Sequence, residues 1–109
     1  MKKILTLFFA FIVTLSANAV CVTKIFKAYD EGEYYGKIVL GSNCRFSLST
    51  VDGERFEGTY EIVADELIAG RTYTLYFYLS DGRKISATYA WGIQDGQSIL
   101  LDGFVFREN

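Results

Sequence analysis

The side chains available for acid–base chemistry in this sequence are carboxylates, because the chain contains no histidine. The acidic groups that lie close together in the sequence, and are therefore candidates for catalysis or metal binding, are Glu57 and Glu61, Asp65 and Glu66, and Asp30, Glu31 and Glu33. A glycosidase needs two carboxylates that face each other across a cleft, one with a raised pKa, and a calcium loop needs more ligands at regular spacing. These groups instead fall at turns and on a predicted outer strand face. Without histidine there is also no Ser–His or Cys–His pair and no His-ligated zinc or haem. The sequence therefore predicts a protein that is not an enzyme, with no metal and no cofactor.

Aromatic side chains offer a second kind of chemistry, which is binding; they make up 17% of the chain. Exposed Tyr and Trp give large contact areas at low entropic cost. The candidate ligand- or partner-binding residues are Trp91, Tyr89, Tyr76, Tyr78, Tyr34 and Tyr35. Trp91 and Tyr89 precede the polar loop 92–97, which we expect to form the mouth of a ligand site. The alternative is that tyrosines fill half-buried strand positions, which their β-propensity favours.

The only two cysteines are Cys21 and Cys44. An even pair in an exported chain predicts one disulfide, closing a loop of about 24 residues for a stabilisation of about 3 kcal/mol. A redox-active thiol pair is the alternative, but it usually shows C-x-x-C spacing.

Residues 1–19 have the layout of a secretory signal peptide. Lys2 and Lys3 precede an apolar run over 4–15, and Ala17-Asn18-Ala19 supplies small residues for cleavage after Ala19. The run is shorter than the roughly 20 residues that cross a bilayer, and Val20 before Cys21 does not suit lipidation. We expect a secreted or periplasmic protein without stable membrane insertion. The net charge of −2 gives no sign of nucleic-acid binding.

Elements that would position these residues are strands, since period-two alternation recurs between turn signals. Asp-Gly occurs at 52–53, 81–82, 95–96 and 102–103. The expected strands are 21–28, 34–40, 44–50, 54–63, 71–79, 83–91, 97–101 and 104–108, and 64–70 is the one stretch expected to form a short helical turn.

Alternation also predicts the hairpin registers. Three-residue loops at 51–53 and 80–82 keep the apolar residues of both strands on one face, and a two-residue loop at 102–103 does so for the last hairpin. Cys44 then faces inward, which suits a buried disulfide that joins the first strand to the third.

The predicted fold is all-β: residues 20–109 form a single domain, a small antiparallel up-and-down barrel of about eight strands, after a signal peptide helix. Sequential hairpins favour the barrel over the alternative, a two-layer sandwich. Gly58-Thr59-Tyr60 and the closing 102–107 segment resemble the small lipocalin-like domains of exported bacterial proteins over residues 44–108. In size, export and single disulfide the chain is also similar to small periplasmic barrels that inhibit lysozyme.

These expectations indicate an exported, non-catalytic binding module for a small apolar ligand or for an envelope or extracellular protein. The small inward residues Gly36, Gly58 and Ala87 would line the ligand cavity. The alternative function is an inhibitor or immunity-type protein that blocks an extracellular or periplasmic hydrolase through one loop.

The first prediction concerns processing. The intact mass of the exported protein should correspond to a chain that begins at Val20 and lacks two hydrogens, because the signal is removed and Cys21 bonds to Cys44. Reaction of both cysteines with a thiol reagent under native, oxidising conditions would contradict the disulfide.

Overall fold

The computed structural model describes residues 19–108, which form nine β-strands. Their bounds are β1 Ala19–Val20, β2 Lys24–Asp30, β3 Glu33–Leu40, β4 Arg45–Thr50, β5 Arg55–Val63, β6 Arg71–Leu79, β7 Lys84–Gly92, β8 Gly96–Leu101 and β9 Phe104–Glu108. The predicted signal peptide, apart from Ala19, lies outside the described residues. Within them, no helix has the length and apolar character to cross a bilayer.

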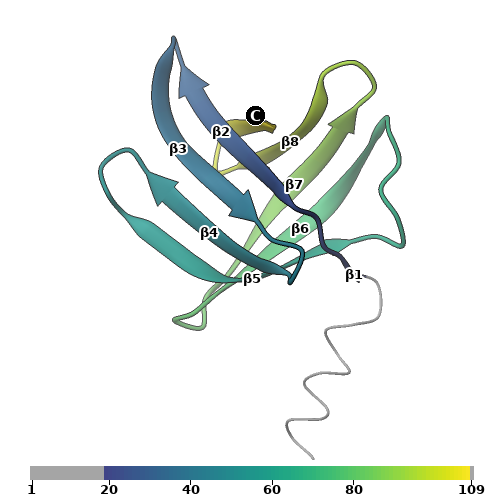
Figure 1. Ribbon diagram of the computed structural model, residues 1–109, viewed down its shortest axis with the longest axis horizontal. Helices are drawn as coiled ribbons and strands as arrows, with labels where there is room; N and C mark the ends of the chain where they lie inside the picture. The colour runs from purple at the N-terminus through teal and green to yellow at the C-terminus, as the bar shows by residue number, and fades with distance from the viewer. Residues whose placement is uncertain (1–18, 109) are drawn as a thin grey trace, which may run out of the picture.

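Strands β2 to β9 pair in chain order, each antiparallel to the next, and β9 returns to pair with β2 (Figure 1). The sheet therefore closes into an eight-stranded up-and-down barrel, which confirms the barrel prediction over the sandwich. Closure removes sheet edges, which otherwise leave backbone donors and acceptors open to other chains. The short β1 runs outside this circuit and pairs with the end of β5.

The predicted hairpin registers are confirmed. In β6–β7, Phe77 lies opposite Ile85, and Leu79 N–H bonds to the Arg83 carbonyl. In β4–β5, Leu48 lies opposite Phe56, and the last hairpin joins Leu101 to Phe104 through a two-residue turn. Because a slip of one residue would turn every apolar side chain outward, burial fixes these pairings.

Two expected elements differ from those in the structure. The first barrel strand begins at Lys24 rather than at residue 21, because residues 21–23 form the unpaired connection between β1 and β2. Residues 64–70 form bends and a turn rather than a helical turn. Gly70 at the end of this segment has a φ of 89° and donates its N–H to the Trp91 carbonyl, so the segment is bound to β7 instead of to itself.

The two barrel ends have different connections. The tight turns between β2 and β3, β4 and β5, β6 and β7, and β8 and β9 share one end, here called the hairpin end. The other end, here called the disulfide end, carries the segments 41–44, 64–70 and 93–95 together with residues 19–23. The disulfide joins Cys21 and Cys44 there, at a Cα–Cα distance of 5.2 Å. It links the residues just before β2 and β4, and Cys44 takes a left-handed φ of 64° at that corner.

Tyr60 anchors the backbone of the disulfide end from the inside of the barrel. Its side chain is buried, and its hydroxyl accepts the Val22 N–H at 2.8 Å. The hydroxyl proton points toward two acceptors, the Val22 carbonyl oxygen at 2.9 Å and the Gly41 carbonyl oxygen at 2.8 Å, and the two share it. Burial raises the pKa of Tyr60, against the lowering effect of the Val22 amide. One phenol thus holds both the N-terminal segment and the β3–β4 connection against the core.

We predict that Tyr60→Phe lowers the free energy of unfolding by about 1–3 kcal/mol, since it removes the hydroxyl that satisfies partly buried backbone groups. The measurement is urea denaturation of the oxidised protein. Tyr76→Phe makes the same chemical change on the outer face of β6 and should stay within about 0.5 kcal/mol of wild type. Equal losses in both variants would show that Tyr60 is not a special anchor.

Candidate functional site

A groove of about 350 Å³ opens at the hairpin end of the barrel. Its apolar walls come from β3, β4, β8 and β9 and from the turns that join them. The apolar lining residues are Tyr35, Leu48, Val51, Leu101, Phe104 and Phe106, and Gly36 also contributes. We call this groove the mouth.

Tyr35 reaches the mouth because β3 carries an irregularity. Gly36 pairs with Ala28 and Tyr34 pairs with Tyr29, so Tyr35 has no partner in β2. An extra residue of this kind is left without a partner across the ladder, and its side chain takes a different direction from that of a regular strand residue. The Tyr35 ring packs against Phe104, with 5.5 Å between ring centroids, while Tyr34 packs edge-on against Tyr29, at 5.8 Å. Adjacent tyrosines therefore serve different surfaces, and only Tyr35 lines the mouth.

A second hollow of about 100 Å³ adjoins the mouth at the hairpin end. The two share Leu48 and Leu101 as walls. The second hollow adds aromatic and aliphatic side chains, Phe46, Phe56, Phe77, Leu79 and Ile85, and one cation, Arg83. Arg83 is ion-paired with Asp81 on the β6–β7 turn, and the other walls are apolar.

Carboxylates surround the rim of the mouth: Asp52, Glu54 and Asp102. The Thr50 hydroxyl donates a short hydrogen bond to Asp52, and this bond is the main cause that lowers the pKa of that carboxyl. Asp52 is thus ionised at neutral pH. The rim favours a ligand with a donor or a positive charge beside its apolar part.

The expected small lining residues have different roles. Gly36 does line the mouth, although a Cβ there would lie 2.8 Å from the Ser49 carbonyl oxygen. Gly58 instead allows β6 to approach β5, because a Cβ would collide with the Tyr78 carbonyl. Ala87 lies on the inward row opposite Leu75 and lines neither hollow.

Tyr89 lies in the core instead of at a rim. Its side chain is fully buried, its hydroxyl donates to the Gln97 side-chain oxygen, and its ring packs edge-on against Phe26. Burial, and then the Glu108 carboxylate, raise the pKa of Tyr89. Trp91 is partly buried beside Gln97 and Arg71, near the disulfide end. The structure therefore places the loop after β7 opposite the mouth, not around it.

Tyr76 and Tyr78 project from the outer face of β6, and each already makes a contact within the protein. The Tyr78 hydroxyl donates to Glu61 at 2.9 Å, and desolvation together with this carboxylate raises the pKa of Tyr78 to about 12. The Lys84 ammonium lies 4.1 Å from the Tyr76 ring centroid. This pair is separate from the mouth.

Within residues 19–108, no three Cys, Asp or Glu side chains are grouped closely enough to hold a metal ion. Comparison of the chain with protein-family models, curated proteins and solved structures finds no match in any of the three.

Sequence reasoning expected the mouth at the other end of the barrel. Polarity and length favoured the loop 92–97, whereas the mouth lies among the tight turns of the hairpin end. A usable signal was present: in an up-and-down barrel alternate connections share an end, so the turns near 31–32, 52–53, 81–82 and 102–103 must lie together. The pattern had already placed Leu48, Leu101 and Phe104 on inward faces at that end.

Glu108 gives a pH-dependent prediction for the disulfide end. Its carboxylate accepts from the Lys24 ammonium at 2.6 Å and from the Gln97 N–H at 3.3 Å. The Lys24 bond is the main cause that lowers the pKa of Glu108 below its ordinary 4.5. A carboxyl with a lowered folded-state pKa stabilises the protein above its ordinary pKa, and this stabilisation disappears as pH falls through the folded-state value.

We therefore predict that Glu108→Gln loses less stability than wild type between about pH 6 and pH 3. Urea midpoints across that range provide the measurement. In a Lys24→Met background the same substitution should change the pH dependence much less, since the main cause of the shift is gone. An unchanged effect of Glu108→Gln in that background would contradict the assignment to Lys24.

Proposed function

We propose that this protein is an exported, non-catalytic binding module that holds the apolar part of a small ligand in the mouth of its barrel. The observation that carries the proposal is the mouth itself, a groove of about 350 Å³ with apolar walls. Small-molecule sites are concave, mainly apolar and about 300–1,000 Å³ in volume. A volume near the lower limit suits a small ligand, or the apolar end of a larger one.

The rim defines the polar part of that ligand. Asp52 and Asp102 stand beside Phe104 at the entrance, so a hydroxyl, amide or ammonium group can meet an acceptor while the apolar part lies inside. A carboxylate or sulfonate on the ligand would be repelled. We therefore favour a neutral or cationic amphiphile.

Three further observations support the proposal. The sequence has the layout of a secretory signal, and the disulfide is compatible with an oxidising compartment. The resemblance to small lipocalin-like domains implies a barrel that encloses a ligand. The carboxylates at the mouth lie on two turns at its rim, Asp52 and Glu54 between β4 and β5 and Asp102 between β8 and β9, and histidine is absent from the chain.

The test is binding of N-phenyl-1-naphthylamine, an uncharged dye that becomes fluorescent in apolar surroundings, to the oxidised protein. We predict saturable binding of one dye, and at least tenfold weaker binding (about 1.4 kcal/mol) in Leu48→Glu, because a charge then occupies a wall shared by both hollows. Phe104→Ser at the rim should weaken binding severalfold; its side chain is 44% exposed, so folding should tolerate the change.

Ile93→Glu is the matched control. It introduces the same charge at a residue that is 81% exposed at the disulfide end, and it should bind the dye like wild type. Circular dichroism and urea denaturation check that each variant folds. The proposal fails if wild type shows no saturable binding, or if folded Leu48→Glu and Phe104→Ser both bind as wild type does.

A further inference from the structure

Three cations stand side by side on the outer face of the barrel, although they are far apart in the sequence. Lys27 on β2 pairs directly with Lys37 on β3 and with Arg107 on β9. Ser49 continues the row beyond Lys37, and Ser98 continues it beyond Arg107. Neighbouring strands are about 4.8 Å apart, so the row presents three positive charges across adjacent strands with a hydroxyl at each end. We call this the basic row.

Folding does not account for the row. Like charges that lie directly opposite each other on neighbouring strands are destabilising, and none of the three cations has an ion-pair partner within residues 19–108. Glu108, the carboxylate that follows Arg107 in the chain, is ion-paired with Lys24. An overall acidic chain therefore keeps an uncompensated positive row, and an anionic partner would compensate it.

Apolar and aromatic side chains border the basic row on both sides. Toward the disulfide end, Ile25 pairs with Val39 on the outer face. Toward the hairpin end stand Tyr29, which is 58% exposed, its edge-on partner Tyr34, and Val105. The surface therefore combines a line of charge with flat rings and aliphatic groups, the combination that binds the charged groups and the C–H faces of acidic sugars.

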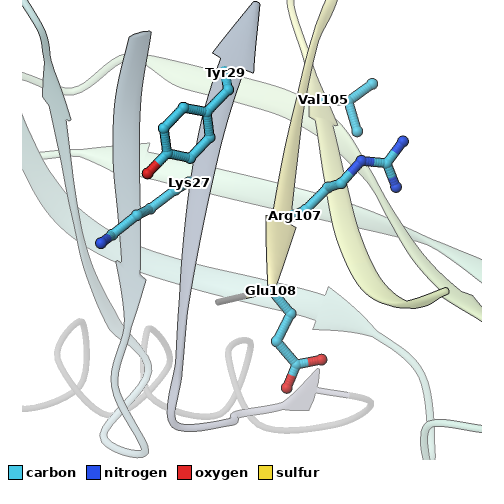
Figure 2. A pocket seen from close by; sticks show the side chains of 5 residues that line it. All are labelled: Lys27, Tyr29, Val105, Arg107 and Glu108. Atoms are coloured by element: carbon cyan, nitrogen blue, oxygen red, sulfur yellow. The ribbon is translucent and has the colours of Figure 1, made fainter. Parts of the chain in front are cut away.

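A hollow of about 170 Å³ lies on the row itself, between β2 and β9. Figure 2 shows Lys27 and Tyr29 on one side of it and Val105 and Arg107 on the other, with Glu108 at its lower end. This volume is about half that of the smallest usual small-molecule sites. It suits one unit of a chain that also contacts the neighbouring strands.

We propose that the basic row binds a linear acidic polysaccharide, whose carboxylate or sulfate groups meet the three cations while one sugar ring packs beside Tyr29. A polymer gains affinity from several weak contacts along the row. An anionic membrane fits less well, because Asp30, Glu31 and Glu33 form the adjacent hairpin tip. A flat anionic surface would meet those carboxylates, whereas a chain can cross β2 without approaching them.

The test is isothermal titration of the oxidised protein with polygalacturonate and with heparin, and with neutral dextran as the uncharged polymer. We expect saturable binding of the acidic polymers at about 20 mM NaCl, much weaker binding at about 300 mM because salt screens the charges, and none of dextran. The triple variant Lys27→Gln/Lys37→Gln/Arg107→Gln should bind at least tenfold more weakly.

The matched control removes three other cations, in the variant Arg45→Gln/Arg71→Gln/Lys84→Gln. Its net charge equals that of the first triple variant, so it should stay within twofold of wild type if the row, and not total charge, is responsible. Tyr29→Ala should weaken polygalacturonate binding severalfold. Equal losses in the two triple variants, or no saturable binding by wild type, would overturn the proposal.

Vesicles that contain phosphatidylglycerol separate the polymer from a membrane. Binding to these vesicles without binding to either acidic polymer would overturn the proposal in favour of a lipid surface. Stability gives a second readout: the first triple variant relieves like-charge repulsion, so its urea midpoint should equal or exceed that of wild type. Loss of polymer binding with an unchanged or higher midpoint cannot come from unfolding.

Discussion

Closure of the barrel between β2 and β9 is the contact on which the rest of the structure depends. Every other pair of neighbouring strands in the circuit from β2 to β9 is joined by a hairpin or a short loop, whereas β2 and β9 lie at opposite ends of that circuit in sequence. Their ladder is short and runs only from Phe26–Glu108 to Ala28–Phe106. Without it, β2 and β9 would both be open edges able to pair with other chains. The disulfide and Tyr60, which hold the segment before β2 in place, therefore also hold the closure in register.

The place where this ladder stops lies beside both proposed binding surfaces. Beyond Ala28 and Phe106 the two strands are no longer paired. On the inside, Tyr35 of β3 packs against Phe104 of β9, and both form part of the mouth wall. On the outside, Tyr29 and Val105 border a shallow hollow. The end of this ladder thus lies beside one groove on each face of the sheet.

Local patterns predicted the parts of the fold that depend on local sequence. Alternation and Asp-Gly turns gave the strands and the three hairpin registers, because a slip would expose whole apolar rows. They did not place the mouth at the hairpin end, because that placement depends on how all connections are distributed. Tyr89 was misjudged because a tyrosine near a loop resembles a rim residue until a buried partner, here Gln97, is known. The side-by-side position of Lys27 and Arg107 depends on the closing ladder, and no stretch of sequence contains it.

Period-two geometry keeps the two proposed sites independent, although they share strands. Along β2 and β9, side chains alternate between the interior and the outer face, so Ala28 and Phe106 pack inside while Lys27 and Arg107, one residue away on each strand, lie outside. A substitution on one face leaves the side chains of the other in place. The charge signs also differ, with carboxylates around the mouth and cations along the basic row. Under the two proposals, a polyanion would be repelled by the carboxylates around the mouth, and an apolar ligand would gain nothing from the basic row. Binding at either proposed site would then be lost without any change at the other.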